Sequence, residues 1–165
     1  MKEHDHTENS ATQRPKYTPR MIMKLLALLC IVFVFIPAFV VSCSGQEVSI
    51  SAMNVVVGIR ERGFTLVEPN PLLLVCLILP VITLIALCSK TRTASKTGLC
   101  ALICMAADGV VWLTFMLNVK AVAKENFCVA ETTLWFYINM LCIIAIVILS
   151  ALSIRKIVEM DKGFL

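Results

Sequence analysis

Four long apolar runs divide the chain, and each has close to the length that a helix needs to cross a bilayer. A helix rises about 1.5 Å per residue, so about 20 residues cover the roughly 30 Å of hydrocarbon. Charged residues are rare inside the runs, and polar segments separate them. The pattern therefore predicts an all-α membrane protein, a four-transmembrane-helix bundle, with spans over residues 21–41, 72–88, 99–119 and 133–154.

The segments outside these runs are too short to form a second folded domain of their own. Residues 1–20 contain Pro15 and Pro19 and almost no apolar side chains, which predicts a flexible tail. Residues 21–165 then form a single membrane domain.

The outer loop, residues 43–70, carries a different pattern. Val48 and Ile50 alternate with serines, which is the period of a half-buried strand, and residues 64–68 form a second candidate strand. We predict that the two strands pair as a small two-stranded β hairpin on the extracytoplasmic side, resting on the ends of the spans.

Prolines mark three positions in the predicted helices. Asn70 followed by Pro71 is typical of a helix start and predicts where the second span begins. Pro37 in the first span and Pro80 in the second lack the amide that a helix needs, so each predicts a kink.

Composition and charge add a location and an orientation. Hydrophobic residues make up 59% of the 165 residues, above the roughly 45–50% of soluble domains. Eleven of the 15 Lys and Arg residues lie in residues 1–24, in residues 89–97 and after residue 154. Because basic residues stay on the cytoplasmic side, we expect a multi-pass plasma-membrane protein with both termini in the cytoplasm. The net charge of +4 suits anionic lipid headgroups, and we expect no nucleic-acid partner.

One carboxylate, Asp108, lies near the middle of the third span. A charged Asp at that depth costs roughly 2.5–3.5 kcal/mol. Cys100, Cys104, Asp108 and Trp112 recur at four-residue spacing, which predicts one shared face directed into the bundle or at another subunit. Thr83 and Asn139 are the predicted intramembrane polar contacts, together with the backbone carbonyl that Pro80 leaves free.

Three interpretations of Asp108 remain open. It could be protonated and form hydrogen bonds between helices. It could contact a basic residue of a different membrane subunit. It could also carry a proton or cation, as a lone acid does in small four-helix exporters.

Of the eight cysteines, only Cys43 and Cys128 lie in the predicted outer segments, where disulfides persist. We predict a disulfide between them, and we interpret the other six as small apolar residues. Two alternatives involve Cys43. The V-V-S-C sequence at residues 40–43 looks like a lipobox, after which cleavage would leave a lipidated Cys43. The four-span outline also resembles quinone-linked disulfide-generating oxidoreductases, but those need a reactive cysteine pair in the first outer loop, where Cys43 stands alone.

Residues 37–46, P-A-F-V-V-S-C-S-G-Q, carry a family resemblance. The segment resembles uncharacterised bacterial four-span membrane proteins with a Val-Ser-Cys-Ser-Gly-Gln-like outer turn. The resemblance implies a bacterial plasma membrane and supplies no activity. Claudins share the four-span outline with outer strands, but the Trp and paired-Cys signature of their first loop is missing.

These patterns predict a non-enzymatic scaffold or subunit of a membrane assembly, without metal or cofactor. Its expected partners are the lipid bilayer and either further copies of itself or another membrane subunit. The first alternative is a small transporter or channel component that uses Asp108 to bind a proton or cation. The second is a membrane thiol-disulfide oxidoreductase.

Overall fold

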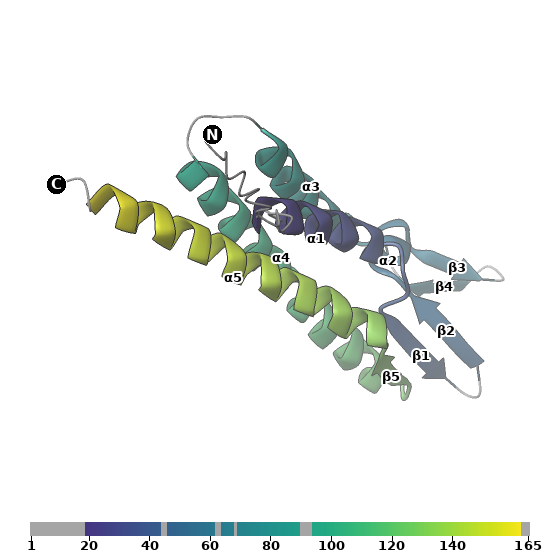
Figure 1. The fold of residues 1–165 in the computed structure, drawn as a ribbon. Coiled ribbons are helices and arrows are strands. Elements are labelled where there is room, and N and C mark those ends of the chain that lie inside the picture. The colour runs from purple at the N-terminus through teal and green to yellow at the C-terminus, as the bar shows by residue number, and fades with distance from the viewer. Residues whose placement is uncertain (1–18, 44–45, 62–63, 68, 90–93, 163–165) are drawn as a thin grey trace, which may run out of the picture.

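The computed structural model describes residues 19–43, 46–61, 64–67, 69–89 and 94–162, and the fold is mostly helical with two small sheets at one end (Figure 1). In chain order the elements are α1 (Pro19–Phe33), β1 (Phe39–Cys43), β2 (Gln46–Ile50), α2 (Ala52–Val57), β3 (Ile59–Glu61), β4 (Phe64–Val67), the 3-10 turn η1 (Pro71–Leu74), α3 (Val75–Cys88), α4 (Ala94–Glu125), β5 (Val129–Thr132) and α5 (Leu134–Lys162).

Three segments are long and apolar enough to cross a membrane: Pro71–Cys88, Lys96–Glu125 and Leu134–Arg155. They confirm the second, third and fourth predicted apolar helices. The second begins as predicted, because Asn70 Oδ1 accepts a hydrogen bond of 3.1 Å from the amide of Leu72. The predicted tail, residues 1–20, lies outside the described residues except for its last two.

The four longest helices form a ring. α4 packs against α3 and α5, and α1 closes the ring by packing against the same two helices. Figure 1 shows both sheets at one end of this bundle, which we call the sheet end. The first residues of α1 and the last residues of α5 lie at the other, which we call the opposite end.

The backbones of α4 and α5 approach closely at two glycines. A Cβ atom on Gly98 would lie 3.1 Å from Cγ1 of Ile154, and one on Gly109 would lie 3.4 Å from Cγ2 of Ile143. The two glycines are 11 residues apart, and so are the two isoleucines. The helices therefore run antiparallel in constant register, which gives a scale of depth along the bundle.

Gly98→Val is expected to destabilise the bundle by about 1–3 kcal/mol, because the added methyl groups would overlap Ile154 in a packed contact. The measurement is the thermal unfolding temperature of the purified protein in detergent. The control is Ala106→Val, on the exposed side of the same helix. Equal melting of the two variants would contradict the close approach.

The first predicted span is wrong as a continuous helix. α1 has 15 residues, about 22 Å at the usual rise, and it ends at Phe33. The last part of the predicted span, residues 39–41, belongs to strand β1, which continues to Cys43. Pro37 lies beyond the helix, so the predicted kink is replaced by a helix end. The physical reason is that Pro37 lacks an amide and also disfavours the helical conformation at Ile36. Pro80, in contrast, lies inside α3.

Other parts of the chain satisfy the non-helical backbone that follows α1. The amide of Met53 donates to the carbonyl of Val34 at 3.2 Å. The amide of Ala38 donates to the carbonyl of Ile50, and the carbonyl of Ala38 accepts from the amide of Thr133, both at 2.9 Å. Non-helical backbone at membrane depth is tolerated only when the protein supplies such partners.

The predicted two-stranded hairpin is also wrong, although both of its strands exist. β2 pairs antiparallel with β1, and β1 pairs on its other side with β5, so the larger sheet has the order β2-β1-β5. β4 pairs with β3 in a separate two-stranded sheet. The central strand β1 comes from the apolar run that was assigned to the first span. The side chains of a strand that packs on a protein core are apolar because they are removed from water. The same is true of a helix in a membrane, so the two give similar sequence patterns.

Side chains of β1 attach the sheet to the bundle. Phe39 is fully buried, with its ring centroid 5.0 Å from that of Phe115 in an edge-to-face arrangement and 5.4 Å from that of Phe136. Trp112 joins the same group, with centroids 5.9 Å from Phe115 and 6.0 Å from Phe136. We call these four residues the aromatic cluster. Trp135 is about half exposed, as a membrane-interface belt requires.

Candidate functional site

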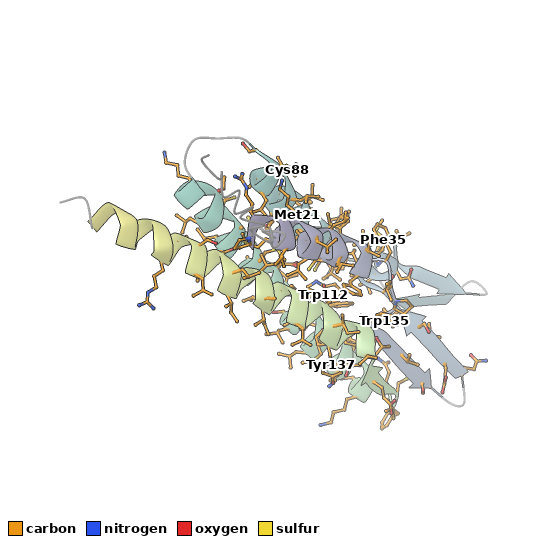
Figure 2. All side chains as sticks on the ribbon, in the orientation of Figure 1. Met21, Phe35, Cys88, Trp112, Trp135 and Tyr137 are labelled. Carbon is orange, nitrogen blue, oxygen red and sulfur yellow. A yellow bond between two sulfur atoms is a disulfide. The ribbon has the colours of Figure 1, made fainter. Side chains whose placement is uncertain are left out.

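Four polar side chains are buried in the helical bundle: Thr83 on α3, Asp108 on α4, and Asn139 and Ser150 on α5. Each is at most 1% exposed. Three of them, Thr83, Asp108 and Asn139, are the predicted intramembrane polar residues, and sequence reasoning missed Ser150. Figure 2 shows the position of Trp112, one helical turn from Asp108, within the ring of helices.

Asp108 faces the centre of the ring. Its carboxyl group interacts electrostatically with the thiols of Cys30 on α1 and Cys76 on α3, so it approaches two helices besides its own. Cys30 lies in the last turn of α1, where the partial negative charge of the helix dipole is located. Cys142 of α5 lies near Cys30. Asp108 is therefore enclosed by its own chain.

No hydrogen bond satisfies these groups among the residues that the structure describes. Both carboxyl oxygens of Asp108, the hydroxyl of Thr83 and both side-chain polar atoms of Asn139 are buried without a partner. The predicted polar contacts therefore share the bundle interior but do not bond to one another. Buried polar atoms are nearly always paired, so these five atoms single out this part of the bundle interior as the candidate site.

The helix register orders the four residues by depth. Thr83 lies beside Cys104, four residues from Asp108 and about 6 Å closer to the opposite end. Asn139 lies four residues from Ile143, the neighbour of Gly109, and therefore about 6 Å closer to the sheet end. Ser150 lies on the opposite-end side of Thr83. The four residues thus follow one another in depth along the bundle, and we call this set the polar line.

Comparison with known proteins does not assign this chain to a family. No family model, curated protein or solved structure matches this chain. The function must therefore be argued from the geometry of its own residues.

The predicted shared face of α4 is confirmed at Asp108 and Trp112, which are buried, and is wrong further along. Cys100 and Cys104 are only partly buried, whereas Met105 is fully buried. The reason is that a step of four residues turns about 40° past a full helical turn, so strict four-residue spacing drifts off the face. The described residues contain no group of three or more His, Cys, Asp or Glu side chains that could hold a metal ion.

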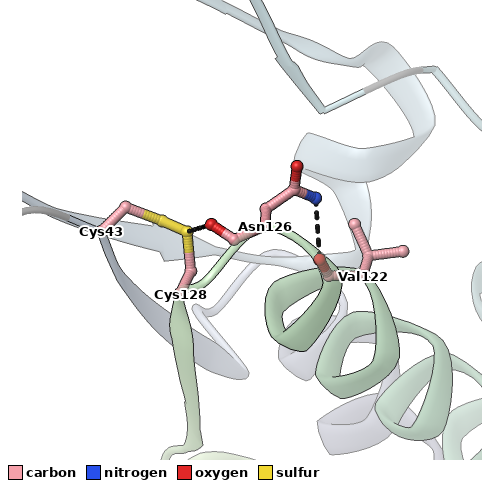
Figure 3. Close-up of a disulfide and its surroundings, with 4 residues drawn as sticks. All are labelled: Cys43, Val122, Asn126 and Cys128. Atoms are coloured by element: carbon pink, nitrogen blue, oxygen red, sulfur yellow. Dashed lines mark hydrogen bonds between the residues drawn. A yellow bond between two sulfur atoms is a disulfide. The ribbon is translucent and has the colours of Figure 1, made fainter.

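The two outer cysteines form the predicted disulfide (Figure 3). Ser42 of β1 faces Val129 of β5, so Cys43 and Cys128 are the next facing pair, with Cα atoms 4.7 Å apart. This is close to the spacing of directly opposed residues in an antiparallel pair. The bond joins the end of β1 to the segment between α4 and α5, across 85 residues of sequence.

An exposed aromatic residue lies beside this disulfide. Phe127 is 98% exposed and has a φ angle of 55°, the left-handed region that residues other than glycine rarely adopt. The turn is held by the amides of Phe127 and Cys128, which donate to carbonyls in the last turns of α4. Asn126 Nδ2 also donates to the carbonyl of Val122 at 2.8 Å (Figure 3). The sequence carries no signal that distinguishes this ring from a buried one.

Proposed function

We propose that this protein is a non-enzymatic subunit or scaffold of a plasma-membrane assembly, and that it binds its partner through the sheet end. The observation that carries the proposal is the fully exposed ring of Phe127, held in a strained backbone conformation beside a disulfide. Strained residues persist where the surrounding structure over-determines them, and they cluster at functional sites.

The membrane does not account for this exposure. In the α4 and α5 register, the interfacial residue Trp135 lies level with Leu117, and α4 continues to Glu125. Eight further helical residues extend about 12 Å, and they include the exposed Lys120 and Lys124. Phe127 therefore follows a charged segment beyond the level of the aromatic belt. An aromatic ring exposed to water is the type of residue that anchors protein interfaces.

The proposed topology has four crossings. α1 and the non-helical residues 34–38 together complete a crossing that α1 is too short to make alone, and the distribution of basic residues favours cytoplasmic termini. The sheet end then lies outside, where the disulfide between Cys43 and Cys128 is stable. The partner is a second copy of this chain or another membrane protein.

Phe127→Asn is expected to dissociate the assembly without loss of folding. Asparagine tolerates a positive φ angle, so the variant removes the ring and keeps the turn. The measurement is native mass spectrometry of protein extracted in mild detergent from its native membrane. The matched control is Val57→Asn, an exposed apolar residue at the end of α2, which packs on η1. A wild-type protein that is a single chain, or a complex that survives Phe127→Asn, would refute the proposal.

A further inference from the structure

We propose that the polar line, Ser150, Thr83, Asp108 and Asn139, is a proton pathway through the bundle, and that Asp108 is the group that binds the proton. This inference uses the interior of the bundle and does not depend on the assembly proposed above. It rests on the burial of the four residues, on the unpaired atoms of Thr83, Asp108 and Asn139, and on the order of the four residues in depth.

The surroundings of Asp108 determine the charge of the species that the site binds. Asp108 has no described cationic side chain in the interior, because it is the one charged residue among the buried residues. The groups that face it are the thiols of Cys30 on α1 and Cys76 on α3, and Cys142 of α5 lies beside Cys30. The last turn of α1 adds partial negative charge. A carboxylate in these surroundings lacks any compensating positive charge, so the site favours uptake of a cation.

The spread of the polar residues in depth favours a proton over a metal ion. A bare cation such as Na⁺ needs several oxygen ligands around one point. The four polar residues are instead spread along the axis, and Thr83 and Asn139 lie about 6 Å from the level of Asp108 on opposite sides. A proton needs one carboxyl oxygen only, and water molecules would have to bridge the steps of about 6 Å in depth between the polar residues.

The other polar residues give a proton a route to and from Asp108. Ser150 donates a hydrogen bond of 3.4 Å to Met23 Sδ, so its hydroxyl lies between α5 and α1 toward the opposite end. From there, Thr83, Asp108 and Asn139 lead toward the sheet end. The hydroxyl groups of Ser150 and Thr83 and the carboxyl group of Asp108, bridged by water, can each accept one proton and release another, with no other species consumed. The amide of Asn139 can only orient such a water by hydrogen bonds. Chains of this kind form proton relays in membrane proteins.

The aromatic cluster forms the barrier at the sheet end. Trp112 lies one helical turn beyond Asp108, and Phe115 and Phe39 cover the next level. Apolar rings offer no proton acceptor, so passage across them limits the rate. Opening the cluster should therefore raise proton flux, which is the reverse of what a purely structural role for Asp108 predicts.

The test uses full-length protein in liposomes, a membrane potential set by potassium and valinomycin, and a pH-sensitive dye trapped inside. Proton flux is expected from the wild type and is expected to fall to the level of protein-free liposomes in Asp108→Asn. Phe115→Ala is expected to raise the flux, and the double variant Phe115→Ala/Asp108→Asn is expected to lose it again. Thr114→Val is the control, because its hydroxyl faces outward and bonds to the carbonyl of Val110 in its own helix.

Infrared spectroscopy gives a second measurement that needs no transport. Wild-type protein is expected to show the carbonyl band of a protonated carboxylic acid shielded from solvent, absent in Asp108→Asn. Flux equal in wild type and Asp108→Asn, flux of Na⁺ or K⁺ without protons, or absence of the band at neutral pH would each overturn the inference. An intact disulfide and unchanged thermal unfolding establish that the variants are folded.

Discussion

Phe39→Ala is expected to lower the free energy of unfolding by about 3–5 kcal/mol, the largest effect of any single substitution at the sheet end. Phe39 is fully buried and contacts Phe115 and Phe136, so truncation removes two ring contacts and leaves a cavity. The cavity cannot close easily, because β1 is the central strand and is held by β2 and β5 on its two edges. The sheet should then detach from the bundle before the helices separate.

The matched control for this prediction is Phe35→Ala. Phe35 lies four residues before Phe39, in the connection between α1 and β1, and is 54% exposed, so its truncation should cost little (Figure 2). Both variants are compared by thermal unfolding in detergent and by protease cleavage of the outer segments. If Phe39→Ala melts with Phe35→Ala and remains as resistant to protease, the sheet is not anchored through this ring.

Removal of the disulfide by the double substitution Cys43→Ser/Cys128→Ser is expected to cost about 2–4 kcal/mol. The bond spans 85 residues and restricts the unfolded chain, although helices retained in the bilayer already limit that chain. It also fixes the far end of the β1 and β5 pair, beyond their last backbone pairing at Ser42 and Val129. Its loss should free the turn that holds Phe127.

The measurement is again thermal unfolding, with and without reductant. Reductant should lower the unfolding temperature of the wild type to that of the double variant and leave the double variant unchanged. Cys88→Ser is the control, because Cys88 is an exposed free thiol at the opposite end (Figure 2). A wild type that is insensitive to reductant while the double variant melts early would show that packing of the side chains, and not the bond, provides the stability.

The sequence predicted the three long apolar helices and the disulfide for definite physical reasons. The length of an apolar run can be compared directly with bilayer thickness, without knowledge of neighbouring elements. Asn70 and Pro71 mark a helix start by local hydrogen-bonding rules. Cys43 and Cys128 could be paired because only these two cysteines lie outside the predicted spans, so the pairing followed from topology alone.

The sequence could not show where the first apolar run changes from helix to strand. Phe39 and the valines that follow it are apolar because β1 is central in a sheet and packs on the bundle, and composition does not separate that burial from burial in lipid. The partner of each strand was undetermined for a similar reason. β5 is contributed by a segment nearly 90 residues later, and no local pattern indicates such a pairing.

For the candidate site, the sequence determined that a carboxyl group lies in the middle of an apolar helix, with Thr83 and Asn139 as polar residues in neighbouring helices. Only the tertiary structure decided that Asp108 is enclosed by its own chain, that Ser150 lies on the same line and that α1 ends beside them. Depth along one helix is local and follows from the residue count, whereas which side chains meet at that depth depends on how four separate helices are rotated and aligned against one another.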